Sequence, residues 1–131
     1  MTIDKALLDN LLEQAAASPR LRMNYDLRTS PEDSSQRMLN AMLPGTVLPI
    51  HRHTKTTEVL VLLRGRMEEI FYEENPLRET SRVLLDAGGD VRGLSIPVGQ
   101  WHGINVLEPT VILECKNGAY EPLAQEDMIE V

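Results

Sequence analysis

The feature that most constrains the fold is a succession of short, strand-like runs that fills the chain after residue 35. Gly and Pro residues separate the runs, as expected for turns. The runs are Gln36–Leu43, Thr46–Ile50, Glu58–Leu63, Arg66–Tyr72, Thr80–Leu85, Arg92–Ile96, Trp101–Val106 and Thr110–Lys116. A series of short strands of this kind predicts a closed or sandwiched all-β domain.

The segments on either side of the strands have a different character. Ile3–Ala17 carries apolar residues at helical spacing, which predicts an amphipathic helix that covers a sheet and ends before Pro19. The polar stretch Leu21–Ser35 is expected to be a loop. A chain of 131 residues is expected to form one domain, with a helix and covering loop over 1–35, a β-barrel over 36–120 and a tail over 121–131.

Composition narrows the classes of partner and compartment. A formal net charge of -7 argues against nucleic-acid and anionic-membrane partners, because both would repel an acidic surface. The single cysteine, Cys115, excludes an internal disulfide and the two-cysteine zinc motifs. The residues after Met1 lack the pattern of a secretory signal, and the longest apolar run, Val59–Leu63, is too short to span a bilayer. We therefore expect a soluble, cytoplasmic protein.

The placement of the chain's three histidines predicts a metal site. His51 and His53 are two residues apart, so on a strand both side chains point to the same face. Glu58 follows after a stretch long enough for a tight turn, and His102 can close the site from a distant strand. Three imidazoles and one carboxylate suit one divalent transition metal such as Fe, Mn, Ni, Co, Cu or Zn. Positions left open on such an ion could take water or a substrate.

The same residues stand in a pattern that resembles the cupin superfamily. Gly45, His51-Arg52-His53, Glu58 and Gly65 match its first motif at every position. The second motif is partly matched by Pro97-Val98-Gly99 and His102, while Val91 and Val106 stand where Gly and Asn are expected. The resemblance implies an all-β cupin double-stranded β-helix, or jelly-roll barrel, with an N-terminal α-helix, and metal ligation by His51, His53, Glu58 and His102.

Several short sequence segments resemble the WbuC family of cupin-fold metalloproteins, which is associated with bacterial surface-polysaccharide gene clusters. They include Gln36-Arg37-Met38-Leu39-Asn40-Ala41, Leu63-Arg64-Gly65-Arg66 and Glu114-Cys115-Lys116-Asn117-Gly118-Ala119-Tyr120. Polar residues inside such segments are candidates to line the barrel mouth and bind substrate: Asn24, Gln36, Arg37, Asn40, Lys116 and Tyr120. Arg37 is the preferred anion-binding candidate, because Arg52 alternates with the histidines and is expected to point away from the metal.

These observations leave three functions open. The first is a metal-dependent enzyme, an isomerase, epimerase, hydrolase or oxygenase, that acts on a small polar or anionic substrate such as a sugar or sugar nucleotide. The second is a non-catalytic module that binds or senses a small ligand through its metal. The third is a metal-free sugar epimerase with histidine as general base.

We also expect a homodimer, since the strand Glu58–Leu63 is apolar on both faces after its first residue and needs cover that either a second subunit or the N-terminal helix would supply.

Overall fold

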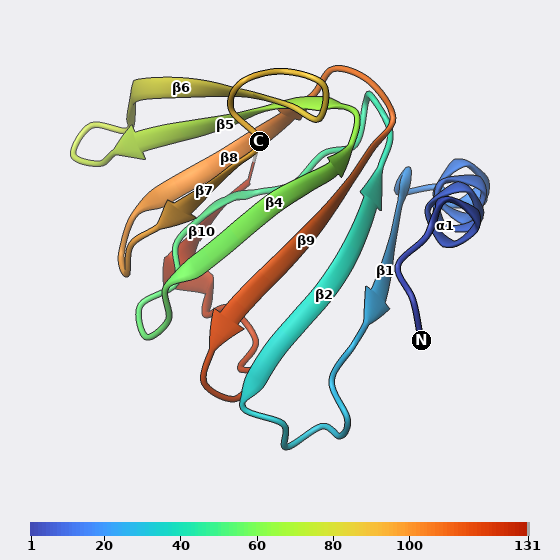
Figure 1. The fold of residues 1–131 in the computed structure, drawn as a ribbon. Helices are drawn as coiled ribbons and strands as arrows, with labels where there is room; N and C mark the ends of the chain where they lie inside the picture. Colours follow the sequence, from blue (N-terminus) through green and yellow to red (C-terminus); the bar gives the residue numbers. More distant parts are fainter. Residues whose placement is uncertain (131) are drawn as a thin grey trace.

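The computed structural model describes residues 1–130 and consists mainly of two antiparallel β-sheets with one α-helix at the N-terminal end (Figure 1). The elements are α1 (Lys5–Ala17), β1 (Arg22–Asp26), β2 (Ser35–Met42), β3 (Ile50–His51), β4 (Glu58–Arg64), β5 (Arg66–Glu73), β6 (Arg78–Asp86), β7 (Gly93–Ile96), β8 (Trp101–Val106), β9 (Thr110–Asn117), the 3-10 helix η1 (Gln125–Asp127) and β10 (Met128–Ile129). The predicted all-β architecture with an N-terminal helix is confirmed.

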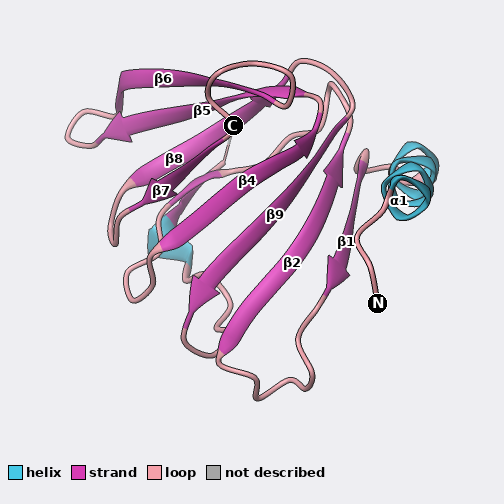
Figure 2. Cartoon of the chain, viewed as in Figure 1, coloured by secondary structure: helices cyan, strands magenta, loops and turns pink. Residues whose placement is uncertain are grey.

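The two sheets have the strand orders β1-β2-β9-β4-β7 and β10-β3-β8-β5-β6, and they face each other as two layers (Figure 2). The main hydrophobic core lies between them. Its buried members come from both sheets and are Met42, Leu60, Leu62, Met67, Leu85, Ile96, Val106 and Ile112. Chain neighbours such as β3 and β4 belong to different sheets, so the short loop between them carries the chain from one layer to the other.

The helix α1 forms a second, smaller core on the outer face of the first sheet. The Asp4 carboxylate caps it by accepting a hydrogen bond of 2.9 Å from the Leu7 amide. Its buried side chains pack against β2 and β9, and the cluster consists of Leu8, Leu11, Ala15, Leu39, Ala41 and Val111. Within residues 1–130, no helix has the length and apolar character needed to cross a membrane.

Two segments differ from the sequence-based expectation. Arg22–Asp26, expected to be loop, forms the edge strand β1, which pairs with β2 through its backbone although only Met23 and Tyr25 are apolar. Thr46–Ile50, expected to be a strand, is mostly irregular, and only Ile50–His51 pairs as β3. Pro49 lacks the backbone donor that a longer ladder would need.

Glycines with positive φ make two of the turns that join the strands. Gly65 (φ 93°) links β4 to β5. A Cβ atom there would lie 2.2 Å from the Pro109 carbonyl oxygen, so only glycine fits beside the β8–β9 turn. Gly45 (φ 94°) lies in the turn after β2.

Candidate metal centre

The three histidines converge at one end of the space between the sheets. His51 on β3 and His102 on β8 are directly paired in register, and His53 follows β3 by two residues. One ring nitrogen from each histidine can be chosen so that all lie within 4.8 Å of one another. Glu58 begins β4 in the opposite sheet, and its Oε2 lies 3.6 Å from Nε2 of both His53 and His102. The cluster therefore joins the two layers.

Backbone carbonyl oxygens orient two of the imidazoles. His51 Nδ1 lies 3.0 Å from the Pro49 oxygen, and His102 Nδ1 lies 2.9 Å from the Gln100 oxygen. A proton on each Nδ1 satisfies these carbonyls and leaves Nε2 with a free lone pair. This is the arrangement by which second partners hold metal-ligating histidines in the correct tautomer.

Two atoms of the cluster are buried without a hydrogen-bond partner among residues 1–130, namely His53 Nε2 and Glu58 Oε2. Leaving such atoms unpartnered in an apolar interior is costly. A cation between them would satisfy both. The donor set of three imidazoles and one carboxylate, together with these unpartnered atoms, fits a divalent transition metal.

The protonation states at neutral pH are those that ligate metals. Burial, with the nearby charge on His102, lowers the pKa of His51 to about 4. Burial and the charge of Lys116 lower the pKa of His53 to about 4. For Glu58 burial favours the neutral acid, but contact with His102 and the charge of Lys116 outweigh it, so its pKa lies below the ordinary value. At neutral pH His51 and His53 are thus neutral and Glu58 is ionised, the forms that ligate metals.

Comparison with known proteins places the chain in a family. A family model described as "Domain of unknown function (DUF6016)" matches residues 3–84. The chain belongs to this family. No curated protein matches it.

Solved structures similar to this DUF6016 protein show the fold. The capsular polysaccharide assembling protein CapF from Staphylococcus aureus superposes with a TM-score of 0.68 at 22% identity, over 87% of this chain and 33% of that one. An oxalate oxidase gives 0.58 at 17% identity over 78% of this chain and 53% of that one. KdgF from Halomonas sp. gives 0.54 at 18% identity over 79% and 84%. The chain thus spans about a third of the CapF chain, and the likenesses confirm the predicted cupin fold.

Arg52 of this DUF6016 chain points away from the histidines, as side-chain alternation predicts. Its guanidinium lies 4.7 Å from the centroid of the Trp101 ring, and Trp101 alternates with His102 on β8. Arg52 Nε donates a 2.8 Å hydrogen bond to Asp127, which fastens the C-terminal segment beside β3. Arg52 thus has a structural role next to the site.

Four of the six predicted substrate-binding residues lie on the inner face of the first sheet. Gln36, Lys116 and Glu58 occupy one row across β2, β9 and β4. Asn24 and Asn40 form another cross-strand pair, and Asn40 Nδ2 donates a 3.2 Å hydrogen bond to the Glu114 carboxylate. Lys116 and Gln36 are thereby brought close to the cluster.

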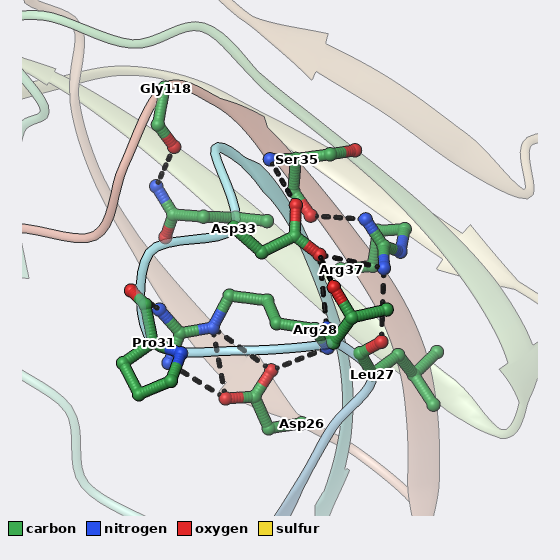
Figure 3. A network of polar contacts seen from close by, with 10 residues as sticks. Asp26, Leu27, Arg28, Pro31, Asp33, Ser35, Arg37 and Gly118 are labelled. Carbon is green, nitrogen blue, oxygen red and sulfur yellow. Dashed lines mark hydrogen bonds and ion pairs between the residues drawn. The ribbon is translucent and has the colours of Figure 1, made fainter.

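The other two predicted substrate-binding residues are not brought to the cluster. Tyr120 is 58% exposed, with the Arg28 guanidinium 5.6 Å from its ring centroid. Arg37 lies on the outer face with Leu39, because the two are separated by one full alternation on β2. Its guanidinium donates hydrogen bonds to the Leu27 carbonyl (3.0 Å) and the Asp33 carboxylate (3.1 Å), within the polar network of the β1–β2 loop (Figure 3). These contacts hold the β1–β2 loop, and anion binding by Arg37 stays a prediction.

Sequence reasoning missed Glu69 on β5, which is 1% exposed between the sheets. Its Oε2 atom has no hydrogen-bond partner within residues 1–130. Burial, with the nearby charges of Glu58 and Glu114, raises the pKa of Glu69 well above the ordinary value. The alternation of Met67, Glu69 and Phe71 on one face of β5 is the signal that could have found this inward-facing acid.

We expect Glu69→Met to raise the free energy of unfolding by about 1–3 kcal/mol at pH 7, because it removes a buried polar group without a partner. Urea unfolding measures the change. Glu68→Met is the matched control: Glu68 faces outward and accepts hydrogen bonds from Arg82 (3.1 Å) and Asn105 (2.8 Å), so its replacement should give no gain. A destabilised Glu69→Met protein would show instead that this carboxyl group strengthens the core.

Proposed function

We propose that this protein is a metal-dependent cupin enzyme. It binds one divalent transition metal (Fe, Mn, Ni, Co or Zn) through His51, His53, Glu58 and His102. Its substrate is a small polar or anionic molecule such as a sugar or sugar nucleotide. The observation that carries the proposal is the convergence of three imidazoles on a buried carboxylate whose Oε2, like His53 Nε2, lacks a hydrogen-bond partner within residues 1–130.

A hollow beside the cluster supports binding of a small molecule. It has a volume of about 390 Å³, and its lining includes His53, Gln36 and Lys116. This size falls within the range of small-molecule sites. A bound divalent ion would polarise a carbonyl or hydroxyl oxygen of the substrate. The chain's own side chains would orient the substrate and fix its position relative to the ligands.

Two likenesses support a role in surface-polysaccharide metabolism. The solved neighbour CapF is a capsular polysaccharide assembling protein, although this chain spans only 33% of it. The sequence segments around Arg37, Gly65 and Lys116 resemble the WbuC family, and we propose that this chain is related to that family.

Purified without an affinity tag, the protein should contain or take up about one divalent metal per chain. Elemental analysis after incubation with Fe(II), Mn, Ni, Co or Zn measures this ratio. His102→Ala should lose the metal, because it removes one imidazole nitrogen from the set. A folded wild-type protein that takes up none of these ions would contradict the proposal and favour the metal-free alternative with histidine as general base.

We also propose that the protein is a homodimer. The helix α1 packs on β2 and β9 and leaves Val59 (45%) and Val61 (39%) exposed on the outer face of β4, so it is not their cover. Light scattering at tens of micromolar should report a dimer. Val61→Lys should shift the mass toward the monomer, while Leu84→Lys, at an equally exposed position on β6, should not. A monomeric wild-type protein would refute the dimer.

A further inference from the structure

We propose that Lys116 is the anion-binding residue of the site, and that the substrate carries an oxyanion, a carboxylate or phosphate, held between the metal and the Lys116 ammonium. The inference rests on the proposed metal site and narrows its substrate class.

The position of Lys116 is the first support. It pairs directly with Glu58 across β9 and β4, and cross-strand partners share one face of a sheet. The Lys116 side chain also lines the 390 Å³ hollow together with His53. A ligand bound in the hollow would therefore meet the metal and the ammonium together.

The free donors of Lys116 are the second support. Its nearest carboxylate oxygen, Glu114 Oε2, lies 3.7 Å from Nζ, and within residues 1–130 the ammonium donates no hydrogen bond. The other two cations that line the hollow are already paired. Lys55 Nζ lies 3.1 Å from Glu121, and Arg52 lies 2.8 Å from Asp127. Lys116 is thus the cation of the hollow with hydrogen-bonding capacity left for a ligand.

Charge balance is the third support. A divalent ion held by three neutral imidazoles and one carboxylate keeps a surplus of positive charge. Lys116 adds to this surplus, and Glu114, 3.7 Å from its ammonium, offsets only the charge of the lysine. An ammonium this close to a metal weakens metal binding unless an anion lies between the two charges. An oxyanion that ligates the metal with one oxygen and accepts a hydrogen bond from Lys116 with another removes this repulsion. The site with its two positive groups therefore fits an anionic ligand better than a neutral one.

The test uses the full chain loaded with Co(II), with metal content measured first. Glycolate and inorganic phosphate are the probes, and they distinguish a carboxylate from a phosphate. Calorimetry measures affinity, and the visible absorption of Co(II) reports a change in metal coordination. Lys116→Met keeps the length of the side chain and removes its charge. Lys55→Met is the matched control, because Lys55 lines the same hollow but is 72% exposed and paired with Glu121.

The loaded wild-type protein should bind at least one probe with a change in absorption, and the metal-free protein should not. Lys116→Met should keep its metal and lose about tenfold or more in affinity for that probe, the loss expected for a hydrogen bond between charged groups. Lys55→Met should stay within about twofold, as expected for an exposed pair. Equal binding by Lys116→Met and wild type, or no binding of either probe by loaded wild type, would overturn the inference alone. Failure of the wild type to take up metal would overturn the proposed function together with it.

Discussion

His51→Ala and His53→Ala should each reduce metal affinity by on the order of a hundredfold or more, because losing a ligand costs at least as much as losing a group that supports one. Both residues offer nitrogens to the same cluster within 4.8 Å. Their replacement should leave a folded protein, since the main core between the sheets contains neither histidine. Elemental analysis and calorimetry on the purified variants measure the effect.

Arg52→Ala is the matched control from the same segment. Its side chain lies over Trp101 and bonds to Asp127, so its loss should leave the metal in place. The loss of the cation–π contact and of the ion pairs with Asp127 and Glu74 should lower the stability only modestly. Equal loss of metal from all three variants would show that the two histidines do not act through their shared face.

The burial of His51 should make its contribution to the stability of the metal-free protein unfavourable in acid. His51 has a pKa of about 4 in the folded protein, mainly because of burial, whereas an exposed imidazole has a pKa of about 6.5. Between these values the unfolded chain binds more protons than the folded one, so the free energy of unfolding falls as the pH is lowered from about 6.5 to about 4. We expect His51 alone to contribute a loss on the order of 2–3 kcal/mol.

Urea unfolding in the presence of a chelator at several pH values between 7 and 4 measures this slope. His51→Gln should flatten it, because the glutamine side chain does not titrate. Glu58 has a lowered pKa, so its contribution to stability is lost only at lower pH, below its ordinary value of 4.5. The raised pKa of Glu69 contributes with the opposite sign, so the test is the difference between the two proteins. Equal slopes for wild type and His51→Gln from pH 6.5 to 4.5 would contradict the burial of a neutral His51 imidazole.

The pairing of His51 and His53 in the candidate site was predictable because their spacing is a local property of the chain. A separation of two positions along a strand places the side chains of His51 and His53 on one face, and the strand register then brings His102 beside His51. Glu69 could not be assigned in this way. Its burial depends on which face of β5 meets the opposite sheet, and its neighbour Glu68 is also a glutamate but faces outward.

Arg37 and β1 are two further features that local sequence patterns could not predict. The segment around Arg37 that resembles the WbuC family indicated a candidate substrate-binding residue, but it contained no information about the face of the sheet to which Arg37 points. In the structure it shares the outer face with Leu39. Strand β1 has too few apolar residues to signal a strand, and it forms because β2 offers it an unpaired backbone edge. Both features depend on the tertiary arrangement.

The backbone at Gly65 has a consequence for how relatives of this chain should be recognised. Gly65 belongs to the same sequence motif as His51 and Glu58. Glycine is required there because the Pro109 carbonyl occupies the space that a side chain would need, and this requirement does not involve the histidines or Glu58. The motif therefore combines two independent physical requirements, one of chain geometry and one of the proposed metal site. A homologue that has lost its ligands can keep Gly65 and the fold. Assignment of metal binding across the family should therefore be made from the histidines and the glutamate, with the glycine counted only as evidence of shared architecture.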